Sequence, residues 1–178
     1  MAAALLIVDV QVGLFCHAPF PLDASGVIER INLLIGRARA AQVPVIFIQH
    51  ESGPEDGLER GSPDWALHPD LARLPHDRVI AKTACDGFCR TELKAVLDGL
   101  RVTELIVAGY ATDFCLDTTL RRAASEGYAV TVAADAHTSK NRPVLKATDI
   151  VAHYNWVWAN FIAPVPIRVR PAAGLLLA

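Results

Sequence analysis

The stretch Leu105-Ile-Val-Ala-Gly-Tyr-Ala-Thr-Asp-Phe-Cys115, continued by Leu116-Asp-Thr-Thr-Leu120, decides how this chain is interpreted. Its first four residues form a short apolar run with isoleucine and valine, which is typical of a buried strand. Its last part repeats small or apolar side chains at i, i+3, i+4 and i+7 from Leu116, which predicts a helix. A turn around Gly109 and Thr112 joins the two, so the stretch predicts a strand, a turn and a helix in succession.

Cys115 lies just inside the first turn of this predicted helix. Unpaired backbone N–H groups and the positive end of the helix dipole favour a thiolate there, which would make Cys115 a nucleophile. Free cysteine is also among the most buried residue types, so a packed core residue is an equal alternative. The choice between the two depends on the rest of the chain.

Strand and helix patterns alternate along the whole sequence. Apolar runs of strand length occupy residues 4–10, 45–48, 78–82, 104–108 and 128–133, and a proline-broken edge strand is expected within residues 161–169. We therefore predict one α/β domain over residues 1–178, doubly wound, with a mainly parallel sheet of about six strands. Helices should cover both faces, as in a Rossmann-like three-layer sandwich.

Helical patterns and one long loop fill the intervals between the strands. A helix capped by Asp23 or Ser25 must stop before Pro44, and Pro143 is expected to open the last long helix. The strand over residues 128–133 should end at the carboxylate of Asp135. Residues 52–76 lack periodicity, which is typical of a functional or a disordered loop, and Trp65 and Leu67 favour a packed one.

Composition excludes several classes of protein. An apolar share of 52% and a charged share of 20% predict a compact globular protein. A net charge of −2 without a basic cluster gives no reason to expect a nucleic-acid or membrane-surface partner. No apolar run reaches the roughly 18–20 residues of a membrane span. The N-terminus runs into a strand pattern without a basic region, so we expect no signal peptide, reduced cysteines and a cytoplasmic location.

Three chemically reactive residues follow predicted strands. Asp9, Lys82 and Cys115 each lie at the carboxyl end of a strand or in the turn after it. Parallel α/β sheets bind ligands outside the carboxyl ends of their strands, so the three side chains can converge. A carboxylate that accepts the thiol proton and an ammonium that favours the thiolate would make a nucleophilic site. A structural Asp9–Lys82 ion pair is the alternative.

Several segments together resemble a known superfamily. Leu6-Ile-Val-Asp9-Val-Gln11, Val79-Ile-Ala-Lys82 and Ala108-Gly-Tyr-Ala-Thr-Asp-Phe-Cys115 resemble the three signature segments of the isochorismatase-like cysteine hydrolases. That superfamily includes nicotinamidases and N-carbamoylsarcosine amidases. Asp135-Ala-His, in the expected turn after the fifth strand, extends a resemblance that spans residues 5 to about 160 in the right order.

The resemblance implies a catalytic triad and an oxyanion hole. Asp9 would be the base, Lys82 the electrostatic partner and Cys115 the nucleophile. A cis peptide between Tyr110 and Ala111 is implied as well. The backbone amides of Ala111 and Cys115 would then stabilise the oxyanion.

No metal or other cofactor is expected. Nicotinamidases carry an Asp-x-His…His metal site after the second strand, where this chain has Gln49-His50-Glu51 and, later, His68. Two histidines without a matching third ligand make a poor zinc site. The chain therefore resembles a metal-free branch of the superfamily.

The cysteine indicates the type of bond that is cleaved. Isochorismatases that hydrolyse a vinyl ether often lack it, whereas a Cys115 thioester suits cleavage of a small-molecule amide C–N bond. Vinyl-ether hydrolysis with Asp9 as the acid stays an alternative. So does a non-catalytic small-molecule-binding or assembly protein that keeps the pocket.

A substrate pocket and an oligomer interface are expected elsewhere. Residues beside the triad, or in the loop that should cover it, are candidates for contact with substrate, with core packing an equal alternative for each: Gln11, Phe15, Trp65, Tyr110 and Thr112. On a helix, residues two apart point different ways, so Trp156 or Trp158 should face outward. We expect that side chain to lie in a homo-oligomer interface.

Overall fold

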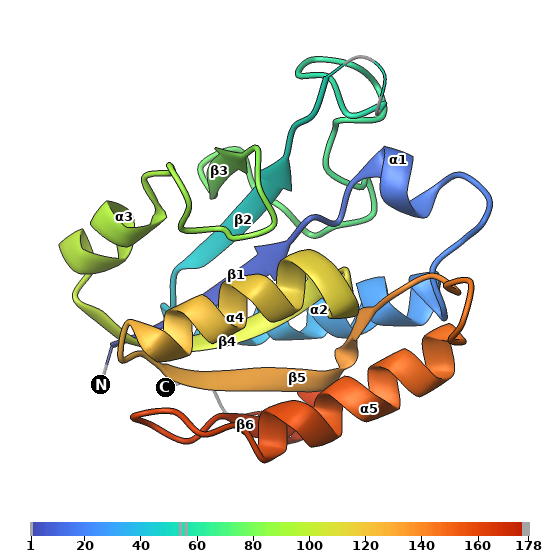
Figure 1. Ribbon diagram of the computed structural model, residues 1–178. Coiled ribbons are helices and arrows are strands. Elements are labelled where there is room, and N and C mark those ends of the chain that lie inside the picture. Colours follow the sequence, from blue (N-terminus) through green and yellow to red (C-terminus); the bar gives the residue numbers. More distant parts are fainter. Residues whose placement is uncertain (1, 54, 56, 176–178) are drawn as a thin grey trace.

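The computed structural model describes residues 2–53, 55 and 57–175 and contains a six-stranded, all-parallel sheet (Figure 1). The strands lie in the order β3-β2-β1-β4-β5-β6. Their bounds are β1 Ala2–Val8, β2 Val45–His50, β3 Arg78–Lys82, β4 Val102–Tyr110, β5 Ala129–Thr138 and β6 Arg168–Arg170. The predicted α/β architecture is confirmed, and the proline-broken tail forms the edge strand β6.

The central strand β1 is apolar throughout because both of its faces are covered. Leu5 and Ile7 belong to one core cluster, whereas Leu6 and Val8 belong to the other. Side chains along a strand alternate between the two faces of the sheet, so a strand buried on both sides needs a continuous apolar run. Fully burying one such side chain stabilises the fold by about 1.5–3 kcal/mol.

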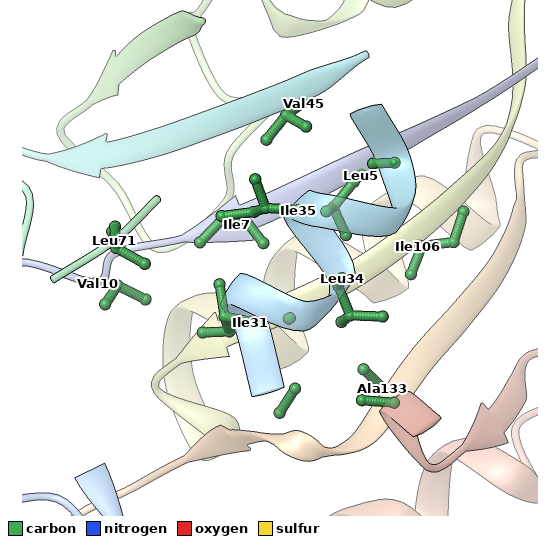
Figure 2. Close-up of a cluster of buried hydrophobic side chains, with 14 of the residues drawn as sticks. Leu5, Ile7, Val10, Ile31, Leu34, Ile35, Val45, Leu71, Ile106 and Ala133 are labelled. Carbon is green, nitrogen blue, oxygen red and sulfur yellow. The ribbon is translucent and has the colours of Figure 1, made fainter. Parts of the chain in front are cut away.

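Helices cover both faces of the sheet. Helix α2 (Ala24–Ala40) places Ile31, Leu34 and Ile35 over Leu5 and Ile7 on one face (Figure 2). The other face is covered by α3 (Leu93–Gly99), α4 (Asp117–Ser125) and α5 (Ala147–Ala159), which share a second cluster with β1 and β4. Figure 1 shows α4 in front of the sheet and α2 behind it. Within the described residues, no helix is long and apolar enough to cross a membrane.

The strand order places a ligand site at one particular edge. The chain winds from β1 outward through β2 to β3 and then returns to place β4 on the other side of β1. Open parallel sheets have their ligand crevice outside the carboxyl ends of the strands where the winding direction reverses. Here that point lies between the ends of β1 and β4, where the short helix α1 (Val12–Phe15) and the loop after β2 extend beyond the sheet (Figure 1).

The backbones of β1 and β4 come unusually close at Gly109. Its φ is +124°, and a Cβ atom there would lie 2.1 Å from the carbonyl oxygen of Val8. Only glycine accepts both conditions. On the other side of β4 the register shifts, because Val107 pairs with Val132 whereas Gly109 pairs with His137. Strand β5 therefore bulges and continues to Thr138, so the predicted end at Asp135 is wrong.

The last helix also begins later than predicted. Helix α5 starts at Ala147, whose N–H is bound by the side chain of Asn141, and Pro143 lies in the preceding loop. That loop closes on itself through a hydrogen bond from Arg142 N to Leu145 O, which leaves Pro143 outside the helix. On α5, Trp158 is fully buried whereas Trp156 is 66% exposed, so one of the two tryptophans faces outward as predicted.

Candidate active site

Asp9 and Lys82 form a buried ion pair at the carboxyl edge of the sheet. Asp9 follows β1 directly, and Lys82 is the last residue of β3. The Lys82 Nζ and Asp9 Oδ2 atoms are 2.7 Å apart, and both residues are at most 2% exposed. Asp9 has a φ of +50°, which turns the chain out of the sheet; aspartate tolerates this left-handed conformation better than most residues.

Cys115 lies in the same place, although it comes from a distant part of the sequence. It belongs to a five-residue π-helical turn, η2 (Thr112–Leu116), between β4 and α4. Its half-buried side chain lines a cavity of about 250 Å³, whose wall also includes Asp9, His50 and Tyr110. The structure therefore brings the three predicted triad residues together: Asp9 and Cys115 line the cavity, and Lys82, outside the lining, binds Asp9.

The charges of the ion pair act on the thiol in opposite directions. Burial lowers the pKa of Lys82, but the Asp9 carboxylate and Cys115 outweigh it, so that this pKa is raised overall. Burial and the Asp9 carboxylate raise the pKa of the Cys115 thiol, and the Lys82 ammonium offsets only part of that rise. This shift runs against the expectation that the helix start favours a thiolate. With its pKa raised by burial and by a carboxylate, Cys115 rests as a thiol.

One oxygen of Asp9 is left available for proton transfer. The Oδ1 atom is buried and has no hydrogen-bond partner, whereas Oδ2 is held by Lys82. An unpaired carboxylate oxygen beside a protonated thiol is a suitable proton acceptor.

The turn before Cys115 has the conformation that the resemblance implies. The peptide bond between Tyr110 and Ala111 is cis. The carbonyl oxygen of Ala111 accepts hydrogen bonds from the N–H groups of Phe114 and Leu116, which closes the π-helical turn. Ala111 and Cys115 both line the cavity, as their predicted oxyanion role requires.

The structure places most of the predicted substrate contacts away from the cavity wall. Only Tyr110 of the five candidates lines the cavity. Gln11 and Thr112 are fully buried, and their polar atoms bind protein groups; Phe15 packs in the core against the ring of Tyr110. Trp65 lies in the wall of a different pocket, and its carbonyl oxygen accepts hydrogen bonds from the amides of Gln11 and Gln49. These four residues support the site from outside the cavity.

Other residues take their place in the cavity wall. Leu14, Leu58 and Phe114 supply apolar surface, and Cys85, His50 and Arg142 supply polar groups. Cys85 and Phe114 are close to Lys82 and Cys115 in sequence, which was the one available signal. Arg142 reaches the cavity from the loop before α5, and nothing in the local sequence marks it.

Arg142 is held rigidly at the cavity wall. Its Nε and Nη2 atoms bind the two carboxylate oxygens of Asp113 at 2.7 and 3.0 Å, and Ser139 binds the same carboxylate. The guanidinium also lies 4.7 Å from the centre of the Phe114 ring. Burial acts to raise the pKa of Asp113, but Arg142 and Ser139 lower it overall, which keeps this carboxylate charged.

The two histidines considered as zinc ligands have other neighbours. His50 Nδ1 lies 3.4 Å from Lys82 Nζ, and the His68 ring packs edge-on against Phe15 with a centroid distance of 6.0 Å. Among the residues that the structure describes, no three His, Cys, Asp or Glu side chains gather where they could hold a metal ion. The absence of a metal cofactor stays a prediction.

His137 supports the active-site turn from beneath. The side-chain Nδ2 of Asn155 donates a hydrogen bond to Ala134 O. The other side-chain atom, Oδ1, therefore accepts from His137 Nε2 at 3.0 Å. His137 Nδ1 must then accept from the hydroxyl of Thr112, at 2.9 Å. Burial lowers the pKa of His137 from 6.5 to about 4, so the ring stays neutral.

Acid is expected to weaken the fold through His137. The pKa of His137 in the folded state lies below that in the unfolded chain. The stability that its neutral ring contributes to the fold is therefore fully present above pH 6.5 and is lost as the pH falls towards 4. The loss is on the order of 3 kcal/mol. Urea unfolding between pH 4 and 8 should show this slope in the wild type but not in His137→Asn, whereas exposed His153→Asn should keep it. Equal slopes in the wild type and His137→Asn would contradict the assignment.

A family model and several known proteins match this chain. A family model described as "Isochorismatase domain" matches residues 3–152. A streptothricin hydrolase from Streptomyces noursei is 36% identical over 140 residues, which cover 79% of this chain and 51% of the relative. The chain thus spans about half the length of that relative.

Two further matches cover most of both partners. A ureidoacrylate amidohydrolase RutB from Methylobacterium radiotolerans is 31% identical over an alignment of 215 residues, which covers 98% of this chain and 83% of the relative. The crystal structure of a cysteine hydrolase from Pseudomonas syringae pv. phaseolicola 1448A superimposes with a TM-score of 0.85 at 26% identity. That match covers 96% of this chain and 89% of the other.

Proposed function

The chain belongs to the isochorismatase family, and from this premise we propose that it is a cysteine hydrolase that cleaves an amide C–N bond of a small molecule. The nucleophile would be Cys115, and the acyl group would be held as a thioester. One observation carries the proposal: Asp9, Lys82 and Cys115 come from three separate parts of the chain, and the charges of the Asp9–Lys82 pair act on the Cys115 thiol beside a cavity that Asp9 and Cys115 line. Burial of an ion pair costs desolvation free energy, which favours a functional role for this pair.

Acylation would begin with transfer of the thiol proton to Asp9. The sulfur attacks the amide carbon, and the carbonyl oxygen becomes an oxyanion near the backbone amides of Ala111 and Cys115. Asp9 then gives the proton to the amide nitrogen, the C–N bond breaks and the amine leaves. The resting thiol fits this sequence, because the proton moves only when the carbonyl carbon is in place.

Deacylation would repeat these proton transfers, with water as the nucleophile and the Cys115 sulfur as the leaving group. A water molecule gives a proton to Asp9 and attacks the thioester carbon, and a second oxyanion forms. The C–S bond breaks, the sulfur recovers its proton from Asp9 and the acid product leaves. In the structure the Lys82 ammonium lies 2.7 Å from Asp9, where it would limit the build-up of negative charge around the sulfur.

The names of relatives support an amide as the substrate. The ureidoacrylate amidohydrolase acts, by its name, on a ureido compound, whose C–N bonds flank a carbonyl group. Small amides and ureides are therefore the substrates to screen first. The cavity of about 250 Å³, with apolar walls from Leu14, Leu58 and Phe114, suits a compact molecule.

Trapping of the thioester tests the proposal. The protein is mixed with a panel of small amides and ureides, quenched in acid and examined by peptide mass spectrometry. We expect an acyl group on the peptide that contains Cys115, absent in Cys115→Ala and kept in Cys89→Ser, which alters an exposed thiol outside the cavity wall. Turnover of an amide by Cys115→Ala would sink the proposal, and turnover of an enol ether by that variant would favour vinyl-ether hydrolysis.

We also propose a homo-oligomer that works in a reducing compartment. Trp156 projects from α5 with 66% of its surface exposed, and Ile162 just beyond the helix is 96% exposed. Large apolar side chains of this kind are buried by association in many proteins. All four cysteines are free, which suits the cytoplasm. Sedimentation of the wild type and Trp156→Glu measures the association directly.

A further inference from the structure

His50 lies beside the catalytic lysine because of the register of the sheet. The last residues of β2 and β3 are His50 and Lys82, and these two residues pair directly. Paired residues on neighbouring strands point to the same face, so both side chains leave the sheet together. His50 Nδ1 and Lys82 Nζ are 3.4 Å apart, and His50 also forms part of the cavity wall.

The chemistry of the two groups defines how they interact. An ammonium group donates three hydrogen bonds and accepts none, so His50 Nδ1 must be the acceptor. A nitrogen that accepts carries no proton. The His50 ring is therefore neutral, with its proton on Nε2.

Lys82 faces three acceptors that come from three different elements. Asp9 Oδ2 lies at 2.7 Å and His50 Nδ1 at 3.4 Å, and the sulfur of Cys115, a weak acceptor, is near enough to help raise the pKa of the same ammonium. The number of acceptors equals the number of N–H bonds on Nζ. With an acceptor for each bond, the ammonium has one preferred orientation towards the sulfur.

A buried glutamine holds His50 in place. Gln11 is fully buried; its Nε2 donates to His50 O at 2.9 Å, and its Oε1 accepts from His50 N at 2.9 Å. The same Nε2 donates to Trp65 O at 2.8 Å, which ties the arrangement to the long loop. The proposed reaction steps use neither Gln11 nor His50. A fully buried side-chain amide nevertheless binds both backbone groups of this histidine.

We propose that His50 is a positioning residue for Lys82. Its neutral imidazole accepts one N–H bond of the ammonium and thereby directs the others at Asp9 and Cys115. The inference rests on the proposed function, since His50 acts only through Lys82 and Cys115. Loss of the acceptor leaves a buried N–H bond unsatisfied and loosens the charge that stabilises the developing thiolate.

Alkylation of Cys115 tests the inference without a substrate. Iodoacetamide labelling is followed at each cysteine by peptide mass spectrometry between pH 6 and 10. His50→Leu should lower the rate at Cys115 about 10-fold at pH 8, whereas His50→Asn, which keeps an acceptor near the position of Nδ1, should stay within about twofold. His76→Leu makes the same change at an exposed site and should leave the rate unchanged.

Two kinds of kinetic result would overturn the inference. Equal rates in His50→Leu and the wild type would show that Lys82 needs no third acceptor. Equal impairment in His50→Asn and His50→Leu would show that the imidazole itself is required. With a substrate in hand, His50→Leu should lower kcat about 10- to 100-fold and change KM less than about threefold.

A spectroscopic measurement remains available if a variant folds poorly, which circular dichroism reveals. In protein labelled with ¹⁵N-histidine, the His50 signals are assigned by their loss in His50→Asn. We expect the neutral ring with an unprotonated Nδ1, and a protonated Nδ1 would overturn the inference. Absence of any acyl adduct at Cys115 would instead count against the proposed function, while the ring state and labelling rates still report on His50.

Discussion

Replacement of Cys115 by alanine is expected to lower kcat on any amide substrate by at least about 10⁴-fold. The thiol supplies the bond that holds the acyl group, and the variant keeps only the binding surface and the oxyanion donors. Cys115 is half-buried and its removal leaves the Asp9–Lys82 pair intact, so the melting temperature should change little. Steady-state kinetics together with thermal melting make the comparison.

Cys89→Ser is the matched control for this prediction, since it removes an exposed thiol outside the cavity wall. It should retain full activity. A Cys115→Ala variant that folds normally and loses less than about tenfold in kcat would show that the reaction does not pass through a thioester. Serine at the same position should be nearly as inactive, because a hydroxyl beside Asp9 is much harder to deprotonate than a thiol.

Removal of one member of the buried ion pair is expected to destabilise the fold strongly. Lys82→Met leaves the Asp9 carboxylate buried without its counter-charge, which costs about 3–5 kcal/mol. Asp9→Asn leaves the Lys82 ammonium with one strong acceptor fewer and should also lower stability. Both variants should lose most of their activity, because each removes a group that acts directly on Cys115.

The double variant separates charge burial from packing. Asp9→Asn combined with Lys82→Met removes both charges, so it should recover most of the stability that Lys82→Met loses, while it stays inactive. Urea unfolding of the four proteins at pH 7 gives the coupling energy. Strictly additive losses would show that the 2.7 Å pair contributes no specific interaction.

Local patterns in the chain were sufficient for the architecture and for the meeting of three reactive side chains. The doubly covered strands are continuous apolar runs because both faces of a parallel sheet are buried. The carboxyl ends of such strands meet at one edge, so the positions of Asp9, Lys82 and Cys115 after apolar runs predict that they converge. Helical spacing alone required that Trp156 or Trp158 face outward, and packing decided that the exposed one is Trp156.

Only long-range packing decided the rest of the site. Gln11 and Thr112 lie within three residues of Asp9 and Cys115 in sequence, but they turn inward and bind His50 and His137. Arg142 reaches the cavity because the loop before α5 folds over Asp113.

The protonation state of Cys115 could also not be predicted from the local sequence. The start of a helix favours a thiolate, but burial and the Asp9 carboxylate, both set by the tertiary structure, raise the thiol pKa. His50 lies beside Lys82 because of the register between β2 and β3, which the sequence of neither strand specifies by itself. Helix and strand periodicity depends on residues that are close in sequence. The distances between side chains, their burial and the charges around them depend on residues that are distant in sequence and meet only in the folded chain.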